Sequence, residues 1–250
     1  MGRDYHIFCS IALSMPYYLT TNFNILLTVY QHCAKEGLKS IGIVGEGLTE
    51  RMYFDYIRSS RRYAFSLKPD LPSHTDYAHI FSKAKSMIAK GYDLVFCVLD
   101  IDVILHEHLL QEFQKACKEL PKSILPITSN PCIEFWFLLH FLDSPKSRVY
   151  ESCESVINKA LRKYIPGYEK TETYLSSFQA FIRMEQNNGL QQALSNADSL
   201  LSILNTKSDV SCCSFTEISL LITFLETCKK CDFSRNCKSC SDGLPTVFGC

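Results

Sequence analysis

Residues 40–142 alternate between short apolar runs and amphipathic segments, and this alternation constrains the fold more than any other feature of the chain. The apolar runs have the length of strands and comprise Ile41–Val44, Tyr63–Leu67, Leu94–Leu99 and Ser123–Thr128. Segments of helical spacing separate and follow them, at about 49–60, 73–91, 105–120 and from 130 onward. Strands that alternate with helices form a parallel sheet with helices on both faces. The sequence therefore predicts an α/β fold with a four-stranded parallel sheet.

Local signals support the expected helix starts. Thr49 is a candidate cap for the first helix, and Ser73 or Thr75 for the second. Asn130 followed by Pro131 is typical of a helix that begins with an Asn cap and a proline in its first position.

The remaining chain divides by composition. Residues 143–227 are expected to form a helical C-terminal extension, with helices at about 149–164, 172–184, 190–205 and 215–228. Residues 1–38 form an N-terminal extension whose Ile7–Met15 stretch is too short for a transmembrane helix. The last segment, 228–250, is rich in cysteine. Residues 39–142 would then be the catalytic domain.

Acidic residues follow two of the expected strands. Glu46 comes after the first strand, and Asp100 and Asp102 end the third. Ligands of parallel sheets gather at the carboxyl ends of the strands. Two aspartates spaced two apart in an extended segment share one face, and clustered carboxylates bind Mg²⁺ or Mn²⁺. We expect Glu46, Asp100 and Asp102 to share one metal ion there, with Glu46 also acting as proton carrier. Glu50 is a weaker candidate ligand, because an acid in the first turn of a helix is also favoured by the helix dipole.

Composition excludes some classes of protein. The formal net charge is zero, so no global basic field indicates nucleic-acid binding, although a local patch remains open. The chain has 13 cysteines. Most are scattered singly in apolar runs, as Cys97 and Cys132 are, where free cysteine packs as a small hydrophobe. Without a clear export signal we expect a reducing, cytoplasmic location and no membrane association.

Three motifs resemble those of the RloB-like family. They are Val44–Phe54 (VGEGLTERMYF), Tyr92–Asp102 (YDLVFCVLDID) and Ser129–Phe141 (SNPCIEFWFLLHF). The resemblance covers about residues 40–205 and implies a Toprim-like catalytic domain. It also implies a metal-dependent nuclease of prokaryotic antiphage defence, acting on nucleic acid (RNA or DNA), some such proteins on RNA such as tRNA. Such proteins often work beside an ATPase partner, and a homo-oligomer is possible.

The third motif places polar residues in an apolar helix. Glu134 is expected to be a metal ligand, a support for the ligands or an acid. His140 is either a proton carrier or a core histidine bonded to backbone. The resemblance places a basic residue near Lys170, which would clamp a phosphate; a solvated lysine is the simpler interpretation. Arg58, Arg61 and Arg62 would contact a nucleic-acid backbone or end a solvated helix.

The cysteine tail has metal-site spacing. Cys228, Cys231, Cys237 and Cys240 form two Cys-x₂-Cys pairs separated by five residues. Four thiolates at this spacing favour a structural Zn²⁺ site, and an iron–sulfur cluster or unmetallated cysteines are the alternatives.

Two other functions remain open. A non-cleaving regulatory module would hold a cation or nucleotide and signal to the ATPase; Ile101 favours it, because the family commonly has a basic residue there. Phosphotransfer of the primase type is a third, weaker possibility. The chain has no phosphate-binding loop of the ATPase kind.

Overall fold

The structure, a computed structural model, describes residues 39–63, 66–74, 76–145, 149–207 and 209–230. The expected extension at 1–38 lies outside these residues. So do Cys231, Cys237 and Cys240 of the tail.

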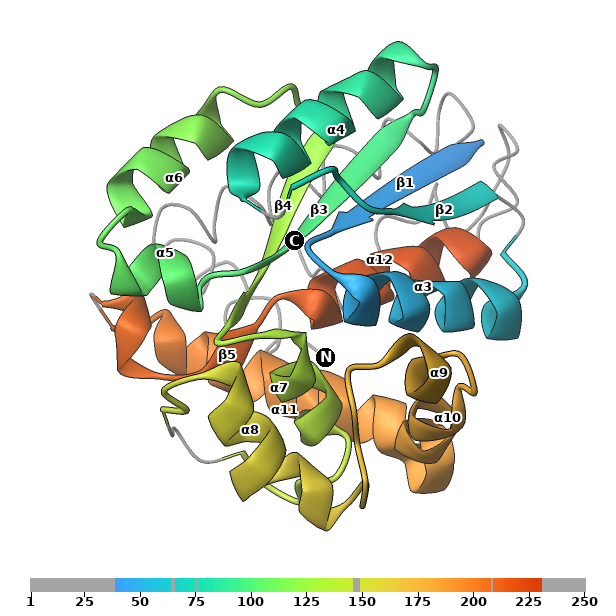
Figure 1. The fold of residues 1–250 in the computed structure, drawn as a ribbon, viewed down its shortest axis with the longest axis vertical. Coiled ribbons are helices and arrows are strands. Elements are labelled where there is room, and N and C mark those ends of the chain that lie inside the picture. Colours follow the sequence, from blue (N-terminus) through green and yellow to red (C-terminus); the bar gives the residue numbers. More distant parts are fainter. Residues whose placement is uncertain (1–38, 64–65, 75, 146–148, 208, 231–250) are drawn as a thin grey trace, which may run out of the picture.

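A five-stranded sheet forms the centre of the molecule (Figure 1). In the order β2-β1-β3-β4-β5, its strands are Ser66–Asp70, Ser40–Gly45, Leu94–Asp100, Ile124–Asn130 and Phe215–Thr216. The first four are parallel, as the sequence predicts, and β5 is antiparallel to β4. The expectation of four strands was therefore wrong by one. The fifth strand has only two residues, too few to show a strand pattern in the sequence. It pairs with the end of β4, where Phe215 is aligned with Asn130 and Thr216 with Ser129.

Alternation along the strands divides the core into two layers. Leu94, Phe96 and Val98 of β3 pack into one apolar cluster, whereas Val95 and Cys97 pack into the other. All five are buried, because a sheet covered on both faces has no solvent side. The larger cluster contains residues from both sides of position 142, so the catalytic domain and the helical extension expected from the sequence share one core.

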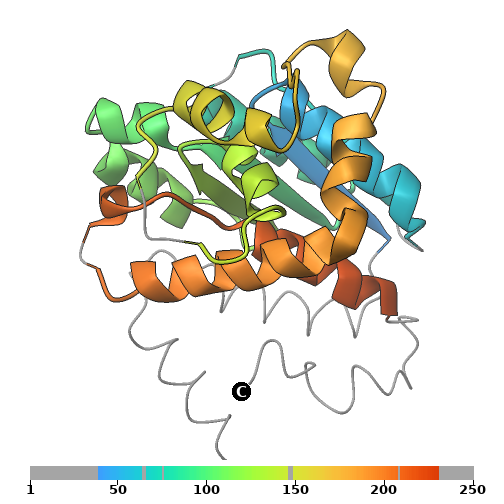
Figure 2. The same ribbon diagram turned by 90° about the horizontal axis from the view of Figure 1, so that it is seen from below.

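Helices cover both faces (Figures 1 and 2). One face carries α4 and α6, whose Phe81 and Phe113 lie in the smaller cluster. The other carries α3, α7 and α12, which contribute to the larger one. The helices of this half of the chain are α3 (Leu48–Arg61), α4 (Tyr77–Ala89), α5 (Asp102–His106), α6 (Leu110–Lys118) and α7 (Ile133–Leu139).

The remaining helices lie in the C-terminal part of the chain, and several of them contact α7. They are α8 (Cys153–Lys159), η1 (Leu161–Lys163), α9 (Glu172–Leu175), α10 (Gln179–Glu185), η2 (Gln186–Asn188), α11 (Gly189–Leu204), η3 (Val210–Cys212) and α12 (Ile218–Lys230). The long helix α11 lies against both α7 and β5 (Figure 2). The region is mainly helical, as expected, but β5 belongs to the sheet.

Two expected helices are interrupted by residues in the left-handed region. His108 has φ of 58° between α5 and α6, and Phe178 has φ of 57° before α10. A left-handed residue cannot continue a right-handed helix. The apolar spacing at 105–120 and 172–184 is helical on either side of the break, so the spacing alone did not reveal it.

Three expected caps were also wrong. Gly47 precedes α3 in place of Thr49, and Asp76 caps α4 by accepting the backbone N–H groups of Ala78 and His79. Asn130 belongs to β4, where its side-chain amide donates to the carbonyl of Cys213, and Cys132 occupies the cap position of α7. The β4–β5 pairing uses Asn130, and this tertiary contact overrides its local preference.

The expected second strand also shifts. The sequence predicts Tyr63–Leu67, whereas β2 runs from Ser66 to Asp70 and so includes Lys68 and Pro69. Pro69 is tolerated because β2 is an edge strand of the sheet.

In the described residues, no helix combines the length and apolarity that a membrane span requires.

Candidate active site

Glu46 and Asp100 meet at the carboxyl ends of two neighbouring strands. Gly45 ends β1 beside Val98 of β3, so the following Glu46 lies next to the end of β3. Its Oε1 accepts a hydrogen bond from the backbone N–H of Asp100 at 2.9 Å. The parallel register therefore places the two acidic motifs at one edge of the sheet, as their positions after the strands predict.

Asp100 also contacts the start of α7. Its Oδ1 accepts the backbone N–H of Ile133 at 3.0 Å. In the parallel pairing of β3 and β4, Asp100 is aligned with Ser129, and the chain turns from β4 into α7 just beyond. The third sequence motif is thus joined to the second by a direct hydrogen bond.

Glu50 lies in the first turn of α3 and is buried. Its Oε2 accepts the backbone N–H of Gly47 at 2.9 Å, so it caps its own helix. A Cβ at Gly45 would lie 2.4 Å from the Cβ of Glu50, which explains why glycine is required at that position. Glu50 therefore has a structural role in addition to lying near the acidic site.

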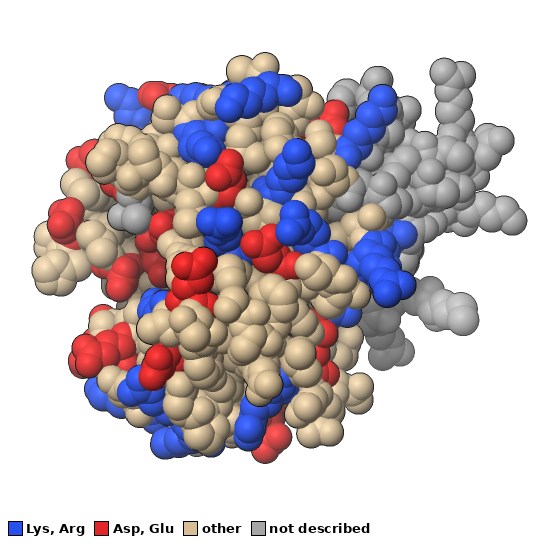
Figure 3. All heavy atoms as spheres, turned by 45° about the vertical axis from the view of Figure 1, so that its right-hand side comes forward, with Lys and Arg blue, Asp and Glu red and all other residues tan. Residues whose placement is uncertain are grey.

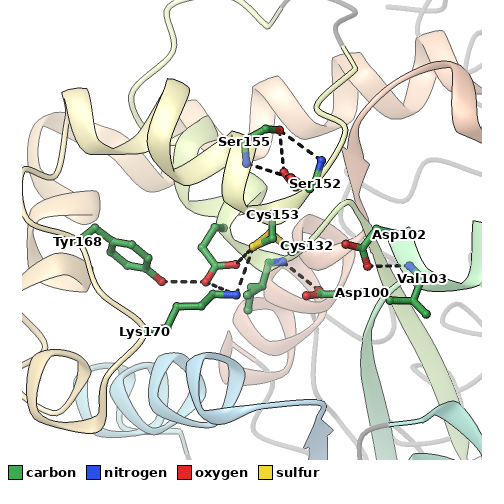
Figure 4. Close-up of a disulfide and its surroundings, with 11 residues drawn as sticks. Asp100, Asp102, Val103, Cys132, Ser152, Cys153, Ser155, Tyr168 and Lys170 are labelled. Atoms are coloured by element: carbon green, nitrogen blue, oxygen red, sulfur yellow. Dashed lines mark hydrogen bonds and ion pairs between the residues drawn. A yellow bond between two sulfur atoms is a disulfide. The ribbon is translucent and has the colours of Figure 1, made fainter. Parts of the chain in front are cut away.

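Asp102 is the first residue of α5 and partly exposed. Its Oδ1 accepts the N–H of Val103 at 2.8 Å. Its charge is one of those that raise the pKa of Glu46, so it lies within electrostatic range of that carboxylate. Figure 4 shows Asp102 and Asp100 at the same end of the sheet.

Glu134 is fully buried on α7 and has three partners. Its Oε1 accepts from the hydroxyl of Tyr168 and from the Lys170 ammonium, each at 3.0 Å. Its Oε2 lies 2.9 Å from the sulfur of Cys153. Lys170 comes from the segment before α9 and brings a half-exposed positive charge to this acidic cluster (Figure 4).

Burial, together with the crowding of carboxylates, raises the pKa values in this cluster. Burial, with Glu50 next in importance, raises the pKa of Glu46 to about 8. Burial and then Glu134 raise the pKa of Glu50 to about 7. Asp100 has its pKa raised well above the usual range, by desolvation first and then by Glu50 and Glu46. Desolvation lowers the pKa of Lys170, but the carboxylates of Glu134, Asp100 and Glu50 together outweigh it and the net shift is upward. The cluster is thus poised to take up a cation or protons.

Other candidate residues lie apart from this cluster. His140 follows α7 at its far end, where Nδ1 lies 3.0 Å from the Trp136 carbonyl and the ring packs against the indole. Burial lowers the pKa of His140 to about 4, so it is neutral near pH 7. This favours the core-histidine interpretation over the proton carrier.

The basic cluster at the end of α3 is largely neutralised. Arg58 pairs with Asp55 at 2.8 Å, and Arg61 pairs with Glu185 and Glu226. On the face shown in Figure 3, basic and acidic side chains are interspersed and form no single patch. These pairs favour the interpretation of this cluster as a solvated helix end.

Cys228 lies inside α12 and is buried in the larger apolar cluster. The other three tail cysteines lie outside the described residues, so the zinc site remains a prediction.

Sequence reasoning missed two parts of the site. Tyr168 contributes a hydroxyl to Glu134, and its spacing of two from Lys170 was the available signal, because an extended segment places such residues on one face. Cys132, interpreted as a free core cysteine, is bonded to Cys153, with 5.5 Å between the Cα atoms. The two cysteines are separated by 21 positions along the chain, and nothing local in the sequence indicated that pairing.

Comparison with known proteins agrees with the motifs. The family model described as RloB-like protein matches residues 41–225. The chain belongs to the RloB-like family. The match includes β1 through most of α12, and so every element that contributes a residue to the acidic cluster. No curated protein and no solved structure was found to match this RloB-like chain.

Proposed function

We propose that this RloB-like protein is a Mg²⁺- or Mn²⁺-dependent nuclease with a Toprim-type site. The observation that carries the proposal is the contact between Glu46 and Asp100 at the carboxyl ends of β1 and β3. Glu50, Asp102 and Glu134 surround this pair, and Lys170 supplies one positive charge. An acidic cluster with a nearby lysine is suited to a divalent ion bound together with a phosphate.

The residues present fit a hard divalent cation. All the donors of Glu46, Asp100 and Asp102 are carboxylate oxygens, which Mg²⁺ and Mn²⁺ prefer. The pKa values of Glu46 and Asp100 are raised first by burial and then by neighbouring carboxylates, whose negative charge one lysine does not compensate. When bound, the ion would polarise the phosphate and lower the pKa of a coordinated water. Asp100 and Asp102 are the proposed ligands.

The other residues of the cluster have proposed roles in proton transfer, phosphate contact or positioning, and the contacts of each support its role. Glu46 would hold or release a proton, since its pKa of about 8 lies near the working pH. Lys170, half exposed, would contact a phosphate oxygen. Glu134 and Tyr168 would position that lysine, because both belong to the same hydrogen-bonded group. Glu50 would hold the turn after β1 and support the negative potential.

The biological setting is proposed from family membership. We propose that the substrate is nucleic acid, with RNA such as tRNA preferred, and that the protein acts in cytoplasmic antiphage defence beside an ATPase. The tail would bind Zn²⁺ through its cysteines.

A non-cleaving regulatory module is the second candidate. Ile101 is buried between Asp100 and Asp102, where a basic residue could have contacted a phosphate. A site that lacks a basic side chain at position 101 would bind a metal ion or a nucleotide without strand cleavage.

A nuclease panel tests the proposal. The full chain would be incubated with Mg²⁺ or Mn²⁺ and with tRNA, single-stranded DNA or duplex DNA. We expect cleavage that EDTA stops and that Asp100→Asn reduces to background. Glu112→Gln is the matched control, because this exposed glutamate lies on α6, away from the acidic cluster.

Two outcomes contradict the nuclease. Undiminished cleavage by a folded Asp100→Asn variant would reject the site. Tight Mn²⁺ binding with no cleavage of any substrate would favour the regulatory module.

A further inference from the structure

Three potential metal ligands gather beside the acidic cluster. Cys132 precedes α7, Glu134 lies in its first turn, and Cys153 begins α8. The two sulfur atoms and one carboxylate oxygen all lie within 4.8 Å of one another. Cys132 and Glu134 are fully buried, whereas Cys153 is partly exposed. In the structure the two cysteines form a disulfide (Figure 4).

The two carboxylate oxygens of Glu134 have different partners. Oε1 accepts from Tyr168 and pairs with Lys170. Oε2 faces the sulfur of Cys153 at 2.9 Å. A hydrogen bond to one oxygen orients the other, as the outer partners of metal ligands commonly do. Glu134 therefore presents Oε2 toward the two sulfurs.

A cation already lies beside these atoms. The Lys170 ammonium is 3.2 Å from the sulfur of Cys153 and 3.0 Å from Oε1 of Glu134. Its side chain is 46% exposed, so it can turn toward solvent without opening the core. The space beside Glu134 and Cys153 therefore attracts positive charge, and the Lys170 ammonium that lies there can be replaced by another cation.

We propose that Cys132, Glu134 and Cys153 bind one thiophilic divalent ion, of the Zn²⁺ class, when their disulfide is reduced. Two thiolates and one carboxylate are ligands that Zn²⁺ accepts, and the fourth tetrahedral position would face the partly exposed side, where Lys170 now lies. Thiolates select against Mg²⁺, so this site differs in chemistry from the all-carboxylate cluster. It does not depend on the nuclease proposal.

The disulfide and the ion exclude each other. Two molecules of an external thiol reduce the Cys132–Cys153 bond, giving two protein thiols and one external disulfide. Each protein thiol then releases its proton to solvent when it binds the ion. The oxidised protein has no thiolate at this position and cannot form the site.

Cobalt binding tests the proposal without any activity measurement. The full chain would carry Ser at Cys231, Cys237 and Cys240, so that the tail contributes no metal site. After reduction by a thiol and anaerobic removal of the reductant, Co²⁺ is added. We expect one Co²⁺ per chain to give thiolate-to-cobalt charge-transfer absorption, and Zn²⁺ should abolish that band. Co²⁺ bound to the all-carboxylate cluster gives no such band.

Matched variants locate the site. Cys153→Ser should weaken Co²⁺ binding by about 10-fold or more and reduce the charge-transfer band. Cys117→Ser, at a partly exposed cysteine on α6, should leave both unchanged. The oxidised protein should show no charge-transfer band. Circular dichroism establishes that each variant is folded.

Alkylation gives a second readout on the unmutated cysteine pair. Zn²⁺ should protect the partly exposed Cys153 of the reduced protein from iodoacetamide, as measured by peptide mass spectrometry. The proposal is overturned if the reduced chain with Co²⁺ shows no thiolate-to-cobalt charge-transfer band, or if a folded Cys132→Ser/Cys153→Ser variant shows the band at equal strength.

Discussion

The carboxylate of Glu46 accepts the backbone N–H of Asp100 at 2.9 Å, so a side chain joins the ends of β1 and β3 beyond their paired residues. The acidic group that follows one strand is thereby held against the acidic group that ends the next. Both have raised pKa values because they share a poorly solvated position. This contact makes the edge of the sheet a defined site, in contrast to two separate solvated loops.

A divalent cation should stabilise the fold. At a Mg²⁺ concentration about 100-fold above the dissociation constant, binding adds about 2.7 kcal/mol to the free energy of unfolding. The melting temperature of the wild-type chain should therefore rise with Mg²⁺, whereas that of Asp100→Asn should not. An equal rise in both, measured by scanning calorimetry, would place the ion elsewhere.

Replacing Gly45 by alanine should disturb the site through Glu50. The new Cβ would lie 2.4 Å from the Cβ of Glu50, so the turn after β1 or the start of α3 must move. We expect a loss of about 1–3 kcal/mol in denaturant unfolding, together with weaker Mn²⁺ binding. Gly47→Ala is the control, since its Cβ meets only the flexible end of Glu50 at 3.2 Å and should cost less. Equal losses in the two variants would contradict the steric explanation.

Removing the Tyr168 hydroxyl should weaken the Glu134–Lys170 group. Tyr168→Phe keeps the ring but leaves the buried Oε1 of Glu134 without the hydroxyl partner at 3.0 Å. Oε1 keeps Lys170 as a partner, so the loss is that of one hydrogen bond to a charged group, about 1.5–3 kcal/mol. Loss of an outer partner lowers metal-site activity by about 10–100-fold. Calorimetry and cleavage kinetics measure the two effects. A variant with wild-type kcat and KM would show that Tyr168 only fills space.

His140 should make the protein sensitive to acid. Burial lowers its folded pKa to about 4 from 6.5, so the unfolded chain binds the extra proton and stability falls as the pH drops from about 6.5 toward 4. The separation corresponds to about 3 kcal/mol, fully retained above pH 6.5. His140→Gln should flatten this part of the stability profile, and the exposed His106→Gln should not. An NMR titration that gives His140 a pKa near 6.5 would contradict the prediction.

Much of the parallel sheet and the meeting of Glu46 with Asp100 followed from sequence pattern. Strand-length apolar runs that alternate with helical spacing report backbone periodicity, which is local, and parallel strands bring their carboxyl ends to one edge. The breaks at His108 and Phe178 did not follow, since apolar spacing continues across them. Nor did β5, because a two-residue strand has no pattern of its own.

The side-chain group around Glu134 depended on tertiary structure. Tyr168, Lys170 and Cys153 lie 19–36 residues beyond Glu134 and reach it only because α8 and the segment before α9 pack against α7. Periodicity thus determined the four parallel strands and the edge at which the acids gather. The packing of distant segments decided which lysine, tyrosine and cysteine complete the cluster, since such contacts depend on the shape of the assembled core and not on spacing along the chain.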